Sequence, residues 1–429
     1  MFWNGHLIKS LDKINASGYT AFMSNTSLVQ PALLSKINER QVLRTIRARG
    51  PQSRAQVARH SGVSAPTASR AVESLLRAGL LEEGDADGDL RGRPARKLRL
   101  ASETVQVLGL VIDAAQCRLV AAGLDGRLHE TRETQFLTPD TYAALIDTAC
   151  DYARRLMDRA QVATLGMAIS MPGLIDYRQG IGILSPNLPL TNERSPSHDL
   201  TERLGIPVVL VQESHALCLA ERDYGAAQNM NDFAMIDVSV GIGLGVMSGG
   251  RLLTGHAGLA GEVGHITVEL DGRPCGCGNL GCLETVASDA ALASMVSQRL
   301  GRKLSVTEVL ALLEKGELTA DAELDRIGRY LAIGLAAVIN LFNPSTLFVH
   351  SRLFSADKTL LQRLIVETGK RALPPSFAHC RIVQARGSKR QGAIAAIIDH
   401  LTESVVPVVM TEAFSGHSAA LRLRSALCV

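Results

Sequence analysis

One histidine and three cysteines lie close together in a glycine-rich stretch of the chain. His265, Cys275, Cys277 and Cys282 fall within eighteen consecutive positions. One imidazole and three thiolates form a ligand set that structural zinc takes in tetrahedral coordination, with no position left for a reactive water. The pattern therefore predicts a structural zinc site that holds a loop in shape.

The same cysteines could instead be small buried residues or form a disulfide. Glycines at 276, 278 and 281 favour the metal site, because glycine adopts positive φ without steric cost and lets a short loop turn its thiolates inward. The chain has eight cysteines, and the other five are isolated. No signal-peptide core is evident, so we expect a reducing cytoplasm, where disulfides are rare.

The size and composition of the chain indicate a globular protein. It has 429 residues, of which 46% are hydrophobic, enough for two or three packed domains. No apolar run reaches the roughly 18 residues that a membrane span requires. We therefore expect a cytoplasmic protein without a membrane span.

Positive charge is concentrated in residues 36–100. This segment contains fourteen Lys or Arg and seven Asp or Glu, a net charge of +7, whereas the whole chain carries +3. A basic segment on an otherwise mildly acidic chain is typical of a nucleic-acid-binding module. A solvated helix face would also be basic, so the folding pattern of the segment has to decide between the two.

That folding pattern predicts three short helices. Residues 38–49 carry apolar side chains at helical spacing and are followed by Gly50. Ser53 and Gln56 form a capping box for the second helix, and a third helix follows over 64–78.

The sequence after the third helix favours a winged helix-turn-helix over a small helical packing module. Residues 80–83 and 97–100, separated by a polar turn, predict a β-hairpin wing. In a helix-turn-helix the last helix enters the major groove of double-stranded operator DNA with its N-terminal residues on base edges. Gly-Arg-Pro at 92–94 can insert an arginine into a narrow minor groove. The expected DNA contacts are Ser64, Thr67, Ser69, Arg70, Arg91 and Arg93.

From residue 105 onward, predicted strands alternate with helices, which indicates α/β layers divided into two lobes. Strands are expected at 105–112, 118–123, 165–170, 208–212, 233–238, 243–247 and 347–350. Helices are expected at 141–159, 214–224 and 324–340.

Four motifs in this part resemble the ROK family of repressors and sugar kinases. They are Met-Pro-Gly-Leu-Ile-Asp at 171–176, Ser-Pro-Asn-Leu at 185–188, Gly-Ile-Gly-Leu-Gly at 241–245, and the histidine and cysteine motif at 261–284. With a winged helix in front, the chain is similar to the repressor branch, which includes glucose-, xylose- and N-acetylglucosamine-responsive regulators. The resemblance implies an α/β fold of the actin-like, sugar-kinase-like (ribonuclease H-like) type.

The resemblance and the charge pattern together divide the chain into five parts. We expect an extension of unassigned role at 1–35, a winged helix-turn-helix at 36–100, a first α/β lobe at 101–213, a second α/β lobe with the zinc loop at 214–400, and a tail at 401–429.

Features that the resemblance would require of a kinase are missing. The turn after the first strand is Asp-Ala-Ala-Gln-Cys at 113–117 instead of an Asp-x-Gly-Gly-Thr type, and Val240 replaces a threonine in the second phosphate loop. Family kinases carry Asn-Asp where this chain has Glu213-Ser214-His215. Serine is no general base, and Glu213 would have to turn to the opposite side of the chain. We therefore expect no phosphoryl transfer, and we interpret His215 as an ordinary helix-start residue.

The sugar-binding positions are better preserved. By resemblance, Asn187, Glu262, His265 and Glu284 match positions that bind sugar hydroxyls, with His265 also a zinc ligand. Glu262 and Glu284 could instead serve only to hold the zinc loop. Ser214 in place of an aspartate removes a strong acceptor, so the effector differs from plain glucose, or binds weakly, or the pocket is vestigial.

These features predict a DNA-binding transcriptional regulator and not an enzyme. We expect a repressor of carbohydrate uptake or catabolism genes that responds to a sugar or phosphosugar, as a homodimer or dimer of dimers. Effector binding between the lobes would change their closure, and with it the spacing of two winged helices on DNA. Two alternatives are a regulator controlled by a transport-system protein and a bifunctional ATP-dependent sugar kinase.

Overall fold

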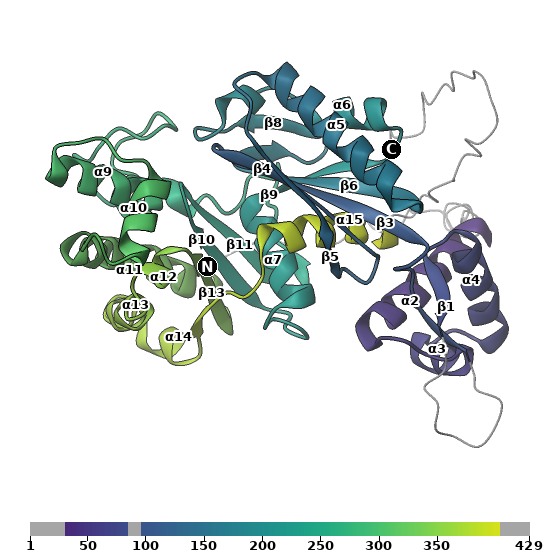
Figure 1. Cartoon of the computed structure of the whole chain (residues 1–429). Coiled ribbons are helices and arrows are strands. Elements are labelled where there is room, and N and C mark those ends of the chain that lie inside the picture. The colour runs from purple at the N-terminus through teal and green to yellow at the C-terminus, as the bar shows by residue number, and fades with distance from the viewer. Residues whose placement is uncertain (1–30, 85–95, 404–429) are drawn as a thin grey trace, which may run out of the picture.

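A winged-helix domain is joined to two α/β lobes in the computed structural model, which describes residues 31–84 and 96–403 (Figure 1). The winged helix contacts the first lobe, and the second lobe lies on the far side of the first (Figure 1). Within the described residues, no helix is both long enough and apolar enough to cross a membrane.

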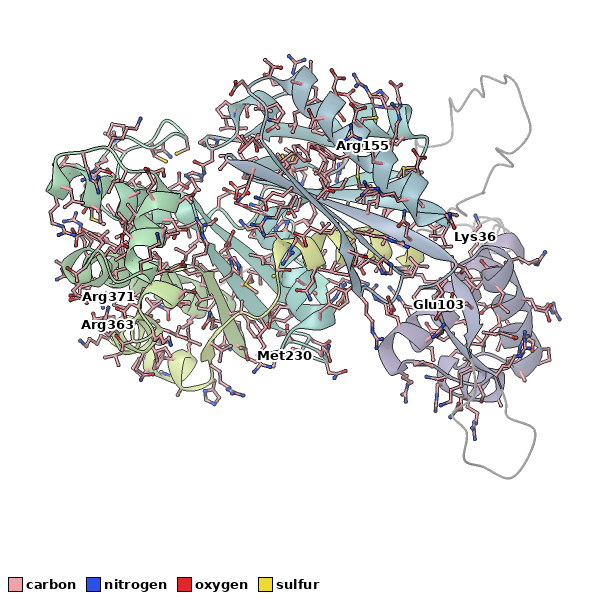
Figure 2. The ribbon with its side chains drawn as sticks, viewed as in Figure 1. Lys36, Glu103, Arg155, Met230, Arg363 and Arg371 are labelled. Carbon is pink, nitrogen blue, oxygen red and sulfur yellow. The ribbon has the colours of Figure 1, made fainter. Side chains whose placement is uncertain are left out.

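The N-terminal domain has the predicted winged-helix order. Its elements are α2 (Pro31–Arg49), α3 (Arg54–Ser61), α4 (Ala65–Arg77) and the antiparallel strands β1 (Leu81–Gly84) and β2 (Lys97–Leu100). The capping box of Ser53 and Gln56 is present, and Ser64 caps α4 as predicted. Helix α2 starts at Pro31, earlier than the expected 38. Among the labelled side chains in Figure 2, Lys36 lies on α2 and Glu103 lies where the chain passes from β2 into the first lobe.

The first lobe is a mixed sheet of strand order β5-β4-β3-β6-β9. The strands are β3 (Val105–Ile112), β4 (Gln116–Ala122), β5 (Leu128–Leu137), β6 (Ala163–Met171) and β9 (Val208–Gln212). Side chains alternate between the two faces: Leu108 packs with helices α5 (Tyr142–Ala160) and α6 (Pro196–Leu204), whereas Val107 faces the opposite core. The hairpin β7 (Leu174–Asp176) and β8 (Ile181–Leu184), followed by the short turn η1 (Pro189–Thr191), completes this lobe.

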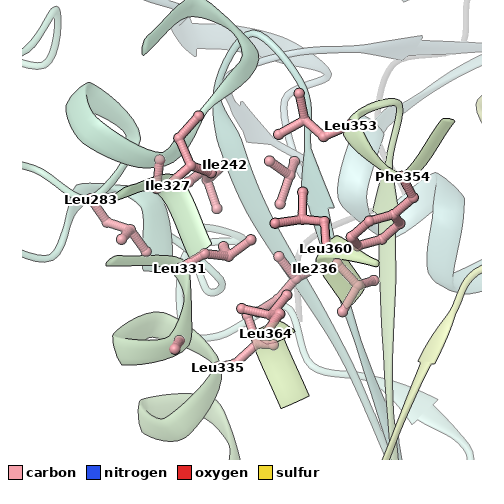
Figure 3. Close-up of a cluster of buried hydrophobic side chains, with 14 of the residues drawn as sticks. Ile236, Ile242, Leu283, Ile327, Leu331, Leu335, Leu353, Phe354, Leu360 and Leu364 are labelled. Atoms are coloured by element: carbon pink, nitrogen blue, oxygen red, sulfur yellow. The ribbon is translucent and has the colours of Figure 1, made fainter. Parts of the chain in front are cut away.

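The second lobe is a sheet of strand order β12-β11-β10-β13-β14. Its strands are β10 (Phe233–Val238), β11 (Ile242–Ser248), β12 (Arg251–Leu252), β13 (Thr346–Ser351) and β14 (Arg381–Gln384). Helix α11 (Asp321–Phe342) packs on the sheet, so that Leu331 and Leu335 lie near Ile236 in the largest buried cluster (Figure 3). The remaining helices around this sheet are α7 (Glu213–Tyr224), α8 (Glu284–Ala287), α9 (Asp289–Leu300), α10 (Val306–Glu314), α12 (Leu353–Ala356), α13 (Leu360–Gly369) and α14 (Pro374–Ala378), with the short turn η2 (Val263–His265).

Helix α15 (Lys389–Glu403) returns to the first lobe, although residues 214–400 were expected to form the second. Its residues Ile394 and Ile397 belong to the same buried cluster as Val107. The physical reason is that α5 and α6 cover only one face of the first-lobe sheet, which leaves the opposite apolar face to be buried. The boundary at the C-terminal end of the second lobe therefore precedes α15.

A substitution at the contact between α15 and α7 tests this packing. A Cβ added at Gly392 would lie 2.1 Å from the backbone oxygen of Ala216 on α7. We expect Gly392→Ala to lower the free energy of unfolding by about 1–3 kcal/mol, because the helices would have to move apart. Gly328→Ala on α11 is the control, because its nearest neighbour would be the Leu360 side chain at 3.6 Å. Equal thermal-unfolding midpoints for Gly392→Ala and wild type would contradict the packing.

Candidate functional site

The loop that carries the three cysteines packs closely against its neighbours at two glycines, Gly281 and Gly276. Gly281 has a φ of 65°, and a Cβ there would lie 1.6 Å from the backbone oxygen of Glu269. Gly278 also has a positive φ, as predicted, whereas Gly276 does not. The expectation for Gly276 is corrected: a Cβ there would lie 2.7 Å from Cβ of Pro186, so its small size lets the loop touch the first lobe.

The four predicted ligand residues converge. Their donor atoms all lie within 4.8 Å of one another. The Sγ atoms of Cys277 and Cys282 are 3.7 Å apart, and Sγ of Cys275 is 3.6 Å from Nδ1 of His265. Ligands around a tetrahedral ion with metal–sulfur bonds of ~2.3 Å are separated by about 3.8 Å. The donor set and its spacing therefore fit one tetrahedral metal ion.

Two carboxylates surround the histidine of this cluster. Glu284 Oε1 lies 3.6 Å from Nδ1 of His265 and 3.1 Å from Sγ of Cys275, and Glu262 Oε2 lies 3.7 Å from Nε2 of the same ring. Burial and the neighbouring Glu284 carboxylate raise the pKa of Glu262, although His265 opposes this. A carboxylate beside the second nitrogen of a metal-bound histidine orients the ring.

Asn187, from the first lobe, and Glu284, from the second, both lie against Gly241. A Cβ added at Gly241 would lie 2.9 Å from both Nδ2 of Asn187 and Oε2 of Glu284. The structure therefore brings the four predicted effector residues together in one chain of close approaches across the two lobes. An amide and two carboxylates in fixed positions can hydrogen-bond several hydroxyls of a sugar ring.

The first residues of α7 lie at the junction of the lobes. The Ser214 hydroxyl donates a hydrogen bond to the Gln212 side chain, and Ser214 packs against the glycines of β11. Glu213 Oε2 lies 2.5 Å from Nζ of Lys389, which is also 2.8 Å from Oδ2 of Asp237 on β10. The carboxylate of Glu213 therefore shares one cation with Asp237 of the second lobe.

The protonation of this interlobe cluster follows from its burial and its ion pairs. Asp237 is 1% exposed. Burial alone would raise its pKa, but Lys389 and His350 hold it below its usual range. Burial raises the pKa of Glu213 despite the opposing effect of Lys389. Burial would lower the pKa of Lys389, but the Asp237 and Glu213 carboxylates raise it, so the ammonium stays charged.

His215 is more deeply buried than is usual for a residue at the start of a helix. It is 1% exposed, and burial lowers its pKa to about 4, so the ring is neutral at pH 7. Its Nδ1 lies 2.7 Å from the Tyr177 hydroxyl, which also accepts a hydrogen bond from the backbone N–H of Gln212. The Tyr177 hydroxyl therefore joins the ring of His215 to the backbone just before α7.

Sequence reasoning missed Lys389, Asp237 and Tyr177. A lysine at the start of a helix is normally solvated, and nothing in its local pattern shows that carboxylates from α7 and β10 surround it. The one available signal was Asp237 in the buried strand β10, because a buried charge needs a partner.

The predicted recognition helix is free to face DNA in the described structure. Ser64, Ser69 and Arg70 are exposed and Thr67 is partly exposed. The Ser64 and Thr67 hydroxyls lie 2.8 Å apart, so these two side chains are already hydrogen-bonded to each other. Arg91 and Arg93, the predicted minor-groove contacts, lie outside the described residues.

Taken together, the fold and the site define a winged-helix protein with a two-lobed, sugar-kinase-like domain. The ROK family model matches residues 107–400, and a MarR family model matches residues 36–92. The chain belongs to the ROK family.

The chain is similar both to transcriptional regulators and to a sugar kinase. The xylose repressor of Bacillus spizizenii is 27% identical over 384 residues, which cover 88% of this chain and 99% of that protein. The solved structure of a ROK family transcriptional regulator, a homolog of the E. coli MLC protein, is 26% identical, with a TM-score of 0.74 over 86% of this chain and 97% of that one. The ROK hexokinase of Thermus thermophilus is 28% identical, with a TM-score of 0.57 over 68% of this chain and 97% of that one. The match to the hexokinase covers a smaller share of this chain than the other two matches do, and a winged helix would account for the difference.

Replacement of a ligand cysteine tests the metal cluster. We expect the wild-type chain to carry one equivalent of divalent metal. Because a preformed set of thiolates is needed to hold the ion, Cys275→Ser and Cys282→Ser should lose it and melt at a lower temperature. Metal content is measured by mass spectrometry after gel filtration. Cys380→Ser, a buried cysteine outside the cluster, is the control. Full metal content in Cys282→Ser would contradict the assignment.

Proposed function

We propose that this protein is a transcriptional repressor that releases operator DNA when a sugar or phosphosugar binds between its lobes. The observation that carries the proposal is Lys389. Its ammonium neutralises the Glu213 and Asp237 carboxylates at the interlobe junction, where the family's kinases would need an available carboxylate base. The chain keeps the fold of the family's kinases, but the Lys389 ammonium already pairs with both carboxylates at this junction.

The effector site rests on residues from both lobes. A sugar bound by Asn187 and Glu284 would hydrogen-bond the first lobe through the amide and the second through the carboxylate. Such a ligand binds the closed arrangement of the lobes better than the open one, and it shifts the population toward closure. The proposed residues for this contact are Asn187, Glu262, His265 and Glu284.

Zinc is the metal proposed for the cysteine cluster. Three thiolates and an imidazole suit zinc, and four protein ligands leave it no open coordination position, so its role is structural. The ion would fix the ring of His265 and the loop that touches Pro186 of the first lobe.

Two copies of the chain are needed for this mechanism. A helix-turn-helix dimer reads two half-sites about one helical turn apart, or a multiple of it, and a change in the separation of its recognition helices lowers its affinity. We propose a homodimer or a dimer of dimers. Control by a transport-system protein remains the alternative for the input, and it would leave the DNA-binding step unchanged.

A substitution on α4 tests the DNA interface. We expect Arg70→Ala to weaken operator binding by about 1–3 kcal/mol, because an arginine near the start of the recognition helix reaches base edges or phosphate. Arg77→Ala, exposed in the last turn of the same helix, is the control. Binding is measured by fluorescence anisotropy on a duplex selected from a random library. If both variants bind with wild-type affinity, α4 does not read the DNA.

A ligand screen tests the effector site. D-glucose, D-xylose, N-acetylglucosamine and their 6- or 5-phosphates are compared by thermal shift, because a ligand specific for the folded state at 100 times its Kd adds about 2.7 kcal/mol of stability. We expect Asn187→Ala and Glu284→Gln to lose the shift, whereas exposed Glu317→Gln keeps it. An unchanged shift in Asn187→Ala would place the ligand elsewhere.

An ATP-coupled assay on the same sugars separates the repressor from a bifunctional kinase. We expect no turnover above a reaction without protein, because Lys389 occupies the carboxylates. Measurable turnover would overturn the regulatory interpretation of the cleft.

A further inference from the structure

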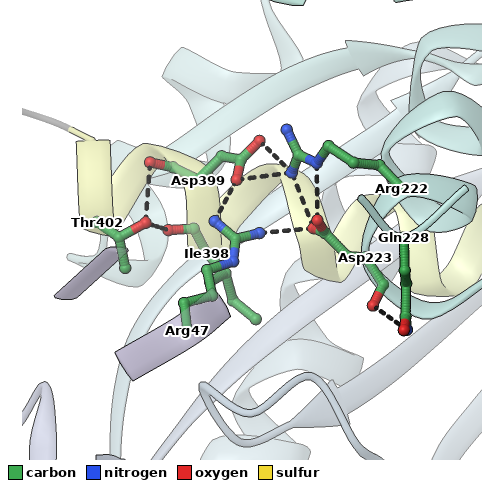
Figure 4. Close-up of polar contacts among 7 residues, drawn as sticks. All are labelled: Arg47, Arg222, Asp223, Gln228, Ile398, Asp399 and Thr402. Atoms are coloured by element: carbon green, nitrogen blue, oxygen red, sulfur yellow. Dashed lines mark hydrogen bonds and ion pairs between the residues drawn. The ribbon is translucent and has the colours of Figure 1, made fainter. Parts of the chain in front are cut away.

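Arg47, in the last turn of α2, joins the winged helix to two helices of the ligand-binding part (Figure 4). Its Nη1 lies 2.5 Å from Oδ1 of Asp399 on α15, and its Nη2 lies 2.5 Å from Oδ2 of Asp223 on α7. The side chain is 22% exposed. One planar guanidinium therefore fixes α2 relative to two helices at once.

A second arginine makes this junction different from a simple ion pair. Arg222 on α7 lies 2.7 Å from Oδ1 of Asp223 and 2.8 Å from Oδ2 of Asp399. It connects α7 to α15. Loss of Arg47 alone would leave the two carboxylates with Arg222, so α7 and α15 would stay cross-linked while α2 loses the two ion pairs of Arg47.

The other ends of α7 and α15 lie at the interlobe cluster. Glu213 is the first residue of α7 and Lys389 the first of α15, and Lys389 also binds Asp237 of the second lobe. Between the two ends the helices are in backbone contact, since Gly392 leaves no room for a side chain against Ala216. A displacement of the second lobe acts on the first residues of both helices, and helices in such close contact transmit it as one body.

We propose that α7 and α15 carry the state of the lobes to the DNA-binding domain, and that Arg47 is the positioning residue that couples them to α2. Val42, Leu43 and Ile46 of α2 belong to a buried apolar cluster that continues from the winged helix into the first lobe and α15. They are non-directional, so they permit several orientations, whereas the two short contacts of Arg47 select one. This inference rests on the proposed function for the nature of the signal, but the attachment itself is independent of any ligand.

The test has one arm that needs no ligand. Arg47→Gln removes both contacts, and Arg49→Gln, an exposed arginine in the same turn, removes the same charge from the same helix. In hydrogen exchange on the full-length proteins, we expect amides of residues 42–49 to exchange several-fold faster in Arg47→Gln than in wild type or Arg49→Gln. Arg47→Lys, which keeps the charge but reaches one carboxylate, should be intermediate. Equal exchange in Arg47→Gln and Arg49→Gln overturns the proposal.

The second arm measures coupling with D-xylose, D-glucose and N-acetylglucosamine. For the sugar that acts on wild type, operator affinity should fall about tenfold, a typical coupling. In Arg47→Gln the fall should be less than about twofold, while the thermal shift by the sugar is retained. A tenfold fall in Arg47→Gln overturns the role of Arg47 and leaves the repressor intact. If no sugar changes operator binding by wild type, the proposed function fails and the exchange arm alone decides the attachment.

Discussion

The burial of one ammonium group between a carboxylate at the start of α7, directly after the first-lobe strand β9, and a carboxylate on the second-lobe strand β10 constrains the rest of the molecule. Removing Lys389 from water is costly, and the cost is offset only if Glu213 and Asp237 stay within hydrogen-bond distance. That requirement fixes the start of α15 against α7 and both against β10. It also explains why the chain returns to the first lobe after completing the second-lobe sheet. The lobes cannot separate at this junction without leaving charge unpaired.

The cysteine loop makes a second contact between the lobes, of a different kind. Its glycine at 276 lies against Pro186, and Glu284 beside it approaches Asn187. These are close approaches without ion pairs, so they can be altered by a small ligand. A metal ion at this loop would hold the second-lobe half of the site rigid and leave the approach of the first lobe as the variable. The ion-paired junction at Lys389 is therefore suited to be a pivot, and the contact of the cysteine loop with the first lobe is suited to be a sensor.

The sequence predicts those parts of the structure that depend on neighbours in the chain. Caps such as Ser53 with Gln56, the buried strand Val105–Ile112 and the closely spaced cysteines all carry local signals, and they are found as expected. Strand β5 (Leu128–Leu137) was missed, because its side chains are mainly polar and its order comes from pairing with β4. The ion pair of Glu213 could not be predicted for a similar reason: its environment is set by Lys389, which follows 176 residues later. Contacts of that separation have no signature in a single sequence.

The net charge of the winged helix overstates what it can offer to DNA. Arg47 is used internally, Arg54 and Arg96 both pair with Glu83, and Arg99 pairs with Glu82. Glu82 and Glu83 are already subtracted in the +7 charge of residues 36–100. Among these arginines, only Arg47 pairs with carboxylates outside the segment, those of Asp223 and Asp399, and so lowers the charge that the domain can offer to phosphate. The slope of affinity against salt counts only the phosphates that are neutralised. The basic composition therefore indicates the kind of partner, whereas our proposals assign the contact itself to Arg70 on α4 and the orientation of the domain to Arg47.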